Sequence, residues 1–329
     1  MKVILIAVFL EGAIRHLIAF QKLIKFQVSS SNRFLHHTKI KLLINPERVY
    51  DIPETGKSKL EKKMEGSNDH FADYGIDHLS ASQINTFISN PCRWILRVSG
   101  YTDKAGNSNM WRGTAADDAV CAMLGGSSKA EALEIGRQSW KNRLDFAVNW
   151  YGSEDNLKEA DKSLGANFGK LDVYINAALD FYEHKTRLLE TQKKISIQDE
   201  SLPIPIIGYI DLEYSDLIRD IKTTARKPAN GQLTEGVSRQ MSVYWKATGK
   251  IPVADYIIVT AKSVSVETLP VFDVQDHWET TIRAAKAMHK VLSISSDIEK
   301  IADYFMPDFS DWSWSEGEIQ EAKKLWRIK

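Results

Sequence analysis

Apolar side chains recur at helical spacing over most of the chain after residue 78. In residues 79–99, Ser80 and Ser82 are good N-cap types, and Ile84, Phe87 and Ile88 follow on one helical face until Pro91 interrupts the pattern. Similar spacing predicts further helices over 111–124, 129–150, 156–192, 231–247, 274–292 and 316–329, the last capped by Ser315.

The pattern changes at residue 194, where polar and apolar residues begin to alternate as they do in strands. Strands are predicted over 194–200, 204–214, 217–224, 256–262 and 264–270. A helical part, a three-strand meander and then helix, strand, strand and helix together predict a mixed α/β fold with one sheet.

Composition excludes several classes of protein. Charged residues make up 26% of the 329 residues and there are nine Trp, as in ordinary globular proteins. Two cysteines, Cys92 and Cys121, cannot form a disulfide framework, a four-Cys zinc site or a four-Cys iron–sulfur cluster, so we expect both to be small core side chains. No apolar run is long enough for a membrane span, and a reducing, cytoplasmic location is expected.

The net charge of zero is the sum of two unlike parts. Residues 1–63 contain 12 Lys and Arg against five Asp and Glu, a net of +7, and the remaining 266 residues carry a net of −7. The apolar run 3–10 is interrupted by Glu11 and lacks a small-residue cleavage site; a secretory signal is one interpretation. The hypothesis we favour is a loosely ordered basic extension, translated from upstream of a natural start at Met64.

Candidate chemistry lies in residues 208–224, GYIDLEYSDLIRDIKTT. A hairpin that turns at residues 215–216 pairs residue 212 with 219 and places Asp211 opposite Asp220, while Asp220 and Lys222 share a face. On the other face, this register pairs Ile210 with Ile221. Two facing carboxylates repel each other, and a hard divalent cation such as Mg²⁺ removes that repulsion.

The same residues have a plainer interpretation, a solvated charged face on an edge hairpin. The flanking residues weigh against it, because Ile-rich strands indicate an interior hairpin in which unpaired acids are costly. Gly208 precedes Asp211 by three residues, and a helix carrying Gln240 and Tyr244 one turn apart follows.

In this order, Gly208-Tyr-Ile-Asp211, Asp220-Ile-Lys222-Thr223 and Gln240-Met-Ser-Val-Tyr244 resemble the RecB-type nuclease domain of the PD-(D/E)xK superfamily. Upstream, LSASQINTFISNPCRWILR resembles the opening helix of that family, and RGTAADDAV resembles its G-T-x-x-H helix. The resemblance implies a restriction-endonuclease-like α/β fold with a central mixed sheet flanked by helices. It implies a nuclease domain over 64–300, with a helical part over 79–192 and a catalytic core over 194–292, followed by a Trp-containing tail and helix over 301–329.

The resemblance also implies roles for single residues. Asp211, Asp220 and the backbone carbonyl of Ile221 correspond to ligands of Mg²⁺ or Mn²⁺, and Lys222 to the catalytic lysine. Gln240 and Tyr244 belong to the rim of the site, or they only pack that helix on the sheet.

Two departures from the family pattern stand out. The family's helix histidine, a metal ligand in many members, corresponds here to Asp117, also a hard-metal ligand, although a one-residue slip would exchange it with Asp118. A solvated Asp117 outside the site is the other interpretation. The four cysteines that hold an iron–sulfur cluster in some relatives are missing, so no cluster is expected.

The function expected from these features is a metal-dependent DNA nuclease, an exonuclease in recombination, repair or phage DNA processing, with a helicase or recombination protein as a partner. Arg112, Arg226 and Lys227 are candidate phosphate contacts. The alternatives are a catalytically inactive nucleic-acid-binding or scaffold protein with the same fold, and an unrelated α/β enzyme in which the D-x-K pattern is accidental.

Overall fold

The computed structural model describes residues 69–185 and 188–329. The chain divides into two units, Met1–Lys62 and Lys63–Lys329, and the fold described here belongs to the second. The expectations for residues 1–63 therefore lie outside the described residues.

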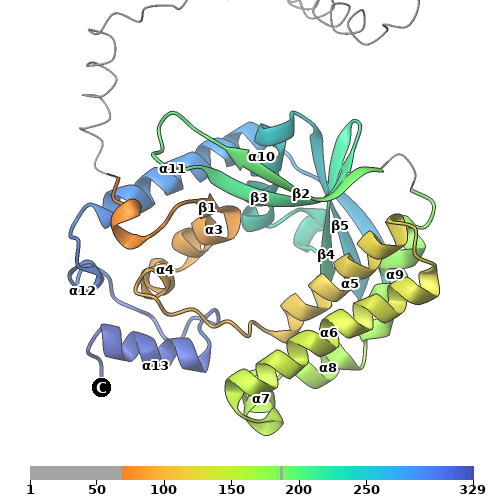
Figure 1. The fold of residues 1–329 in the computed structure, drawn as a ribbon, viewed down its shortest axis with the longest axis horizontal. Coiled ribbons are helices and arrows are strands. Elements are labelled where there is room, and N and C mark those ends of the chain that lie inside the picture. The colour runs from red at the N-terminus through yellow and green to blue at the C-terminus, as the bar shows by residue number, and fades with distance from the viewer. Residues whose placement is uncertain (1–68, 186–187) are drawn as a thin grey trace, which may run out of the picture. The chain divides into compact units, whose positions relative to one another are not determined.

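A mixed sheet forms the centre of the fold (Figure 1). Its strands in the described residues are β1 (Leu79–Ser80), β2 (Leu188–Ile197), β3 (Ile206–Tyr214), β4 (Leu217–Thr224), β5 (Ile251–Val259) and β6 (Val264–Pro270). β1 pairs parallel with β3 and β4 with β5, whereas β2–β3, β3–β4 and β5–β6 are antiparallel. The predicted α/β class with one mixed sheet is confirmed.

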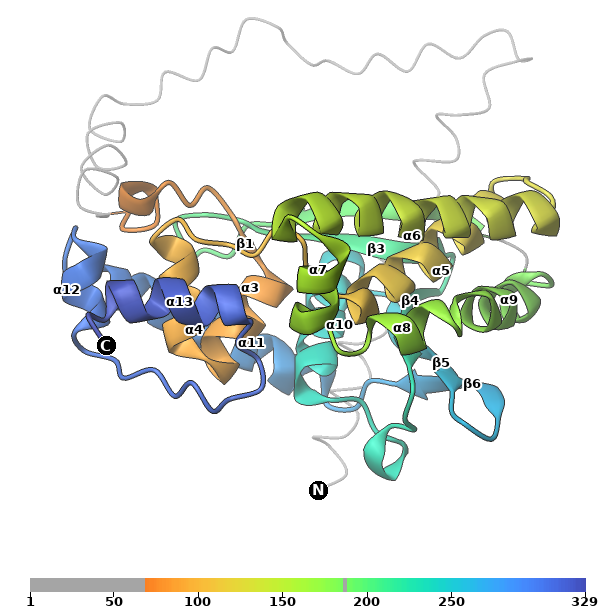
Figure 2. The same ribbon diagram turned by 90° about the horizontal axis from the view of Figure 1, so that it is seen from below.

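Helices cover both faces of this sheet (Figures 1 and 2). The N-terminal helices are α3 (Ala81–Ser89), α4 (Pro91–Val98), α5 (Ser108–Leu124), α6 (Lys129–Tyr151), α7 (Glu154–Ala160), α8 (Leu164–Phe168) and α9 (Leu171–Tyr182). After the meander come α10 (Glu235–Thr248), α11 (Val274–Leu292), α12 (Ile298–Ala302) and α13 (Glu316–Leu325), and two 3₁₀ turns lie at Ala72–Tyr74 and Ala229–Gly231.

Two hydrophobic cores lie on the two faces of the sheet. The α10-side core joins β3 and β4 to α3, α10 and α11, with Met241 and Met288 fully buried. The α5-side core joins the sheet to α5, α6 and α9 and contains Trp111 and Trp140 in edge-to-face contact. Side chains of β5 alternate between the faces, as a strand covered on both sides requires.

Strand β3 is paired differently along its two edges. β2 follows one edge from Ile206 to Tyr214, whereas β1 and β4 share the other edge and pair only with its two ends. The middle of β3, from Gly208 to Asp211, is thus free of a ladder partner on that second edge. This opening in the sheet provides room for polar side chains from the surrounding elements.

The predicted hairpin register is confirmed at Leu212 and Arg219, but the predicted Ile210–Ile221 pair is wrong. Ile210 belongs to the α10-side core and Ile221 to the α5-side core. Ile210 and Leu212 would face the same side of a regular strand, yet they enter different cores, so the alternation of β3 changes at Asp211. The Asp211 carboxylate accepts the Ile221 N–H at 2.8 Å, which takes the place of a ladder bond.

Most predicted helices are present, with one clear error. The single helix expected over 156–192 is instead α7, α8, α9 and the start of β2. The cap residues Ser153 and Asp161 divide the first part, because Ser153 begins α7 and Asp161 ends it. The helix over 274–292 and the Ser315 cap of the last helix are confirmed.

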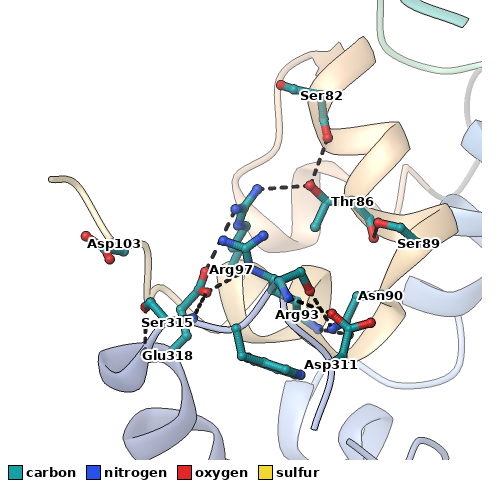
Figure 3. Close-up of polar contacts among 12 residues, drawn as sticks. Ser82, Thr86, Ser89, Asn90, Arg93, Arg97, Asp103, Asp311, Ser315 and Glu318 are labelled. Atoms are coloured by element: carbon teal, nitrogen blue, oxygen red, sulfur yellow. Dashed lines mark hydrogen bonds and ion pairs between the residues drawn. The ribbon is translucent and has the colours of Figure 1, made fainter. Parts of the chain in front are cut away.

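The C-terminal helix α13 packs against α4 through buried charges (Figure 3). Glu318 is 1% exposed, and both of its oxygens accept from Arg93 Nε at 2.8 Å. Arg97 lies 3.8 Å away, and Cys92 packs beside Trp314 in a small core of its own, as expected for a core cysteine. None of the helices in the described part of the chain has the length and apolarity needed to cross a membrane.

Candidate active site

Five of the predicted site residues converge where β3 and β4 separate. Asp211 comes from β3 and Asp220 and Lys222 from β4, while Gln240 and Tyr244 come from α10, which lies against this part of the sheet. Hydrogen bonds, ion pairs and mutual charge effects connect these five side chains and link them to Asp117 of α5.

Buried Asp220 and half-buried Lys222 form the centre of a chain of polar contacts. Lys222 Nζ lies 2.5 Å from Asp220 Oδ2, and Asp220 is 1% exposed. The ammonium is therefore the partner of Oδ2 in a close ion pair. Lys222 also donates to Gln240 Oε1 at 3.2 Å, so that two elements fix the ammonium.

Gln240 links this pair to Tyr244. Its Nε2 donates to Asp220 Oδ1 at 3.1 Å and contacts the Tyr244 hydroxyl at 2.8 Å. Tyr244 approaches β3 at Gly208, where an added Cβ would lie 3.0 Å from Tyr244 Cε1. The glycine of the G-x-x-D pattern therefore makes room for the tyrosine of the Q-x-x-x-Y pattern.

Asp117 faces the same group of carboxylates from α5. Its Oδ2 accepts from Gln192 Nε2 at 2.6 Å, and the same nitrogen lies 3.4 Å from Asp211 Oδ1. The Cys121 thiol donates to Asp117 Oδ1 at 3.7 Å. Both cysteines are predicted to be core side chains. Cys121 is only partly buried against the α5-side core, and its sulfur also contacts the site residue Asp117.

Burial and mutual repulsion perturb the acids. Burial, the neighbouring Asp118 and Asp220 raise the pKa of Asp117 to about 7. The pKa of Asp211 lies well above its usual range because of burial, Asp220 and Asp117, and burial raises the pKa of Asp220 against the opposing effect of Lys222. Asp220 is buried and Asp117 and Asp211 are half-buried, and three acids with raised pKa values in one place are a marker of a functional site.

Lys222 responds to the same environment in the opposite sense. Burial alone would lower the pKa of its ammonium, but the charges of Asp220 and Asp211 outweigh burial and raise that pKa. Lys222 therefore carries a positive charge at neutral pH.

The donor set fits a hard divalent cation in its chemistry. Asp117, Asp211 and Asp220 offer carboxylate oxygens, of which Asp220 Oδ2 is paired with Lys222 and Asp211 Oδ2 accepts the Ile221 N–H. In residues 69–185 and 188–329, however, no three His, Cys, Asp or Glu side chains are gathered closely enough to hold an ion. Mg²⁺ needs only one or two carboxylates beside water and phosphate oxygens, so a pair of these acids suffices.

The three candidate phosphate contacts occupy different environments. Arg112 is 3% exposed; its guanidinium donates to Thr223 Oγ1 and O at 3.2 and 3.1 Å and stacks over Tyr174. In this structure it positions the end of β4 and presents no charge to solvent. Arg226 and Lys227 are exposed directly after β4, and Lys227 pairs with Glu267 at 2.7 Å.

Gln192 is the residue of this site that the sequence analysis missed. It lies inside the segment predicted as helix, and its residue type has no place in the motifs that identified the other positions. An alternating pattern extended from 194 back to 188 would have placed it beside Asp211 in the sheet.

One comparison with known proteins assigns the chain to a family. A family model of the PD-(D/E)XK nuclease superfamily matches residues 78–303, and the chain belongs to this superfamily. No curated protein matches. Among solved structures, a putative exonuclease from Eubacterium rectale is 14% identical with a TM-score of 0.44, covering 74% of this chain and 87% of its own. The structure of SSO0001 is 16% identical with a TM-score of 0.25, covering 43% and 69%.

Proposed function

We propose that this protein is a metal-dependent deoxyribonuclease that hydrolyses phosphodiester bonds, an exonuclease acting in recombination, repair or phage DNA processing. The observation that carries the proposal is the convergence of half-buried Asp211 and Lys222 with buried Asp220 where β3 and β4 separate. Membership of a nuclease superfamily supports hydrolysis. The dependence on a metal, the DNA substrate and the exonuclease mode go beyond that membership, and we propose them here.

Asp211 and Asp220, with Asp117 and the carbonyl of Ile221, are the groups that would hold the ion. Mg²⁺ or Mn²⁺ bound there supplies positive charge that polarises the phosphodiester and stabilises the negative charge of the transition state. Asp211 also fixes Ile221, because its carboxylate accepts the Ile221 N–H. Ligand and backbone are therefore positioned together.

Lys222 acts in this scheme as an ammonium. Its pKa is raised, so it stabilises charge that develops on the phosphate, or donates a proton to it, and does not act as the base. Gln240 holds the ammonium by accepting from Nζ, and Tyr244 contacts Gln240 in turn. Gln240 and Tyr244 are positioning residues for Lys222.

In the proposed complex, the protein contacts DNA only close to the active site. The part of the chain beyond residue 63 has a net charge of −7, so it lacks the charge for a broad basic face. Arg226 and Lys227 lie exposed directly after β4, which supports them as contacts to backbone phosphates, with Lys227 leaving Glu267 to make one. A helicase or recombination protein that delivers DNA ends, and a cytoplasmic location, complete the proposal.

The test is incubation of the full chain with linear, circular and single-stranded DNA, with Mn²⁺, with Mg²⁺ and with chelator. An exonuclease releases nucleotides from linear DNA in the presence of either ion and leaves closed circles intact. Lys222→Met should lower the rate by at least about 100-fold. Lys324→Met, which removes an exposed lysine on α13, should leave the rate unchanged. Undiminished cleavage by the Lys222 variant would overturn the mechanism.

One observation favours a second candidate, a DNA-binding protein without catalysis. Within the described residues no three acidic, His or Cys side chains gather as an ion site, and Asp117 stands where the family has histidine. In the same assay this candidate binds DNA with a steep salt dependence and releases no nucleotides with either ion.

A further inference from the structure

Gln192 lies directly across the sheet from Asp211. The β2–β3 ladder pairs Thr191 with Leu212 and Lys193 with Ile210, which places Gln192 opposite Asp211. The backbone φ angle of Gln192 is 49°, a left-handed conformation that residues other than Gly, Asn and Asp rarely adopt. Pairing resumes at Lys193 on one side, and on the other it covers Thr191 and Glu190 before a register shift between Leu188 and Glu190.

This conformation accompanies a side-chain amide placed between two carboxylates. Gln192 Nε2 lies 2.6 Å from Asp117 Oδ2 and 3.4 Å from Asp211 Oδ1. The amide nitrogen carries two N–H donors, and an ionised carboxylate accepts hydrogen bonds, so one NH₂ group can donate to both acids. Uncommon backbone conformations of this kind cluster at functional sites.

We propose that Gln192 is a positioning residue of the metal site: its amide holds Asp117 and Asp211 in the ion-free protein and is displaced when a divalent cation binds. This inference rests on the proposed function.

Thermodynamic linkage makes the proposal specific. An interaction present only in the ion-free state stabilises that state and weakens ion binding to the same extent. Removing the amide should therefore destabilise the ion-free protein, leave the ion-saturated protein unchanged and strengthen ion binding. A merely structural hydrogen bond would stabilise both states equally.

The experiment measures thermal unfolding of the full chain in chelator and in saturating MnCl₂, with Mn²⁺ affinity from calorimetry. Gln192→Met keeps the length of the side chain and removes the amide, and Gln192→Ala serves as a second variant. Both should lower the melting temperature in chelator only and tighten Mn²⁺ binding about tenfold, the equivalent of one hydrogen bond to a charged group.

Gln198, just after β2, provides the matched control. Its amide donates to Leu202 O at 2.8 Å, away from the acids, so Gln198→Met should lower both melting temperatures equally and leave Mn²⁺ affinity unchanged. If the Gln192 variants lost equal melting temperature in chelator and in MnCl₂, or bound Mn²⁺ more weakly than wild type, the role of Gln192 would be overturned and the proposed metal site would stand. A wild-type protein that binds no Mn²⁺ would overturn the proposed metal site and this inference together.

Discussion

Asp117 and Asp118 are adjacent in α5 but serve different neighbours. Asp117 contacts Gln192 on β2, whereas Asp118 Oδ2 accepts from Ser139 Oγ at 2.5 Å on α6. Successive residues of a helix point about 100° apart, so only one of them can face the sheet opening. The structure thereby separates two residues that a one-residue slip of the sequence motif would exchange.

The first prediction is that neutralising these two residues has unequal effects. Asp117→Asn should reduce metal-dependent DNA degradation at least about 100-fold, because it removes a charged oxygen from the proposed ion site. Asp118→Asn keeps the helix and the hydrogen-bonding capacity toward Ser139, and should retain the wild-type rate within about twofold. The rates are measured with Mn²⁺ on linear DNA, and equal losses in both variants would contradict the assignment.

The second prediction concerns pH. The pKa of Asp117 is raised to about 7, so the folded protein binds this proton more tightly than the unfolded chain does. Its contribution to stability is therefore fully present below about pH 4 and is lost as the pH rises through about 7.

In chelator, wild type should lose roughly 5 °C of melting temperature over this interval relative to Asp117→Asn, which cannot titrate. Mn²⁺ should bind more tightly as the pH rises through the same range, since the ligand must be deprotonated. Parallel melting curves for wild type and Asp117→Asn across pH 5–8 would refute the assignment.

The arrangement of β3 and β4 was largely predictable, because it depends on local alternation and a short turn. The register of Leu212 against Arg219 follows from the turn position alone. The approach of α10 was predictable only through the resemblance, since nothing in the spacing of Gln240 and Tyr244 shows which strand they face. Asp117, which reaches the site from 94 residues before Asp211, likewise depended on the resemblance.

Other features escaped because they depend on tertiary contacts. The change of side in β3 at Asp211 arises where a carboxylate replaces a backbone partner, and alternation cannot reveal it. The role of Arg112 depends on Thr223, 111 residues away, and on Tyr174. The helical prediction over 188–192 failed because Leu, Glu and Gln are good helix formers, and local propensity does not show that β3 lies alongside.

The third prediction tests the close approach of Gly208 and Tyr244. In Gly208→Ala the new Cβ would meet Tyr244 Cε1 at 3.0 Å and Ile195 at 3.4 Å, so the ring must shift. Through Gln240 this shift reaches Lys222, and the degradation rate should fall roughly tenfold. The free energy of unfolding should fall by about 1–3 kcal/mol from overpacking.

Gly165→Ala is the control for that substitution. Gly165 lies in α8 with nothing within 4 Å of an added Cβ, so alanine there should be neutral or slightly stabilising, with unchanged activity. A Gly208 variant that cleaves at the wild-type rate would show that Tyr244 does not position the lysine.

The fourth prediction separates stability from catalysis. Glu318 is buried in α13, and both its oxygens accept from Arg93, while Arg97 lies close by (Figure 3). Glu318→Gln removes the buried carboxylate that both guanidinium groups contact and should lower the free energy of unfolding by about 3 kcal/mol. Glu316→Gln, two residues earlier and exposed, should change it by less than about 0.5 kcal/mol.

Because α13 lies against α4 and contributes no side chain to the Asp211 site, the rate per folded molecule should stay at the wild-type value in both variants. Urea unfolding and degradation rates measured on the same samples decide the matter: a Glu318 variant that is fully stable, or one whose folded fraction is inactive, contradicts this division of roles.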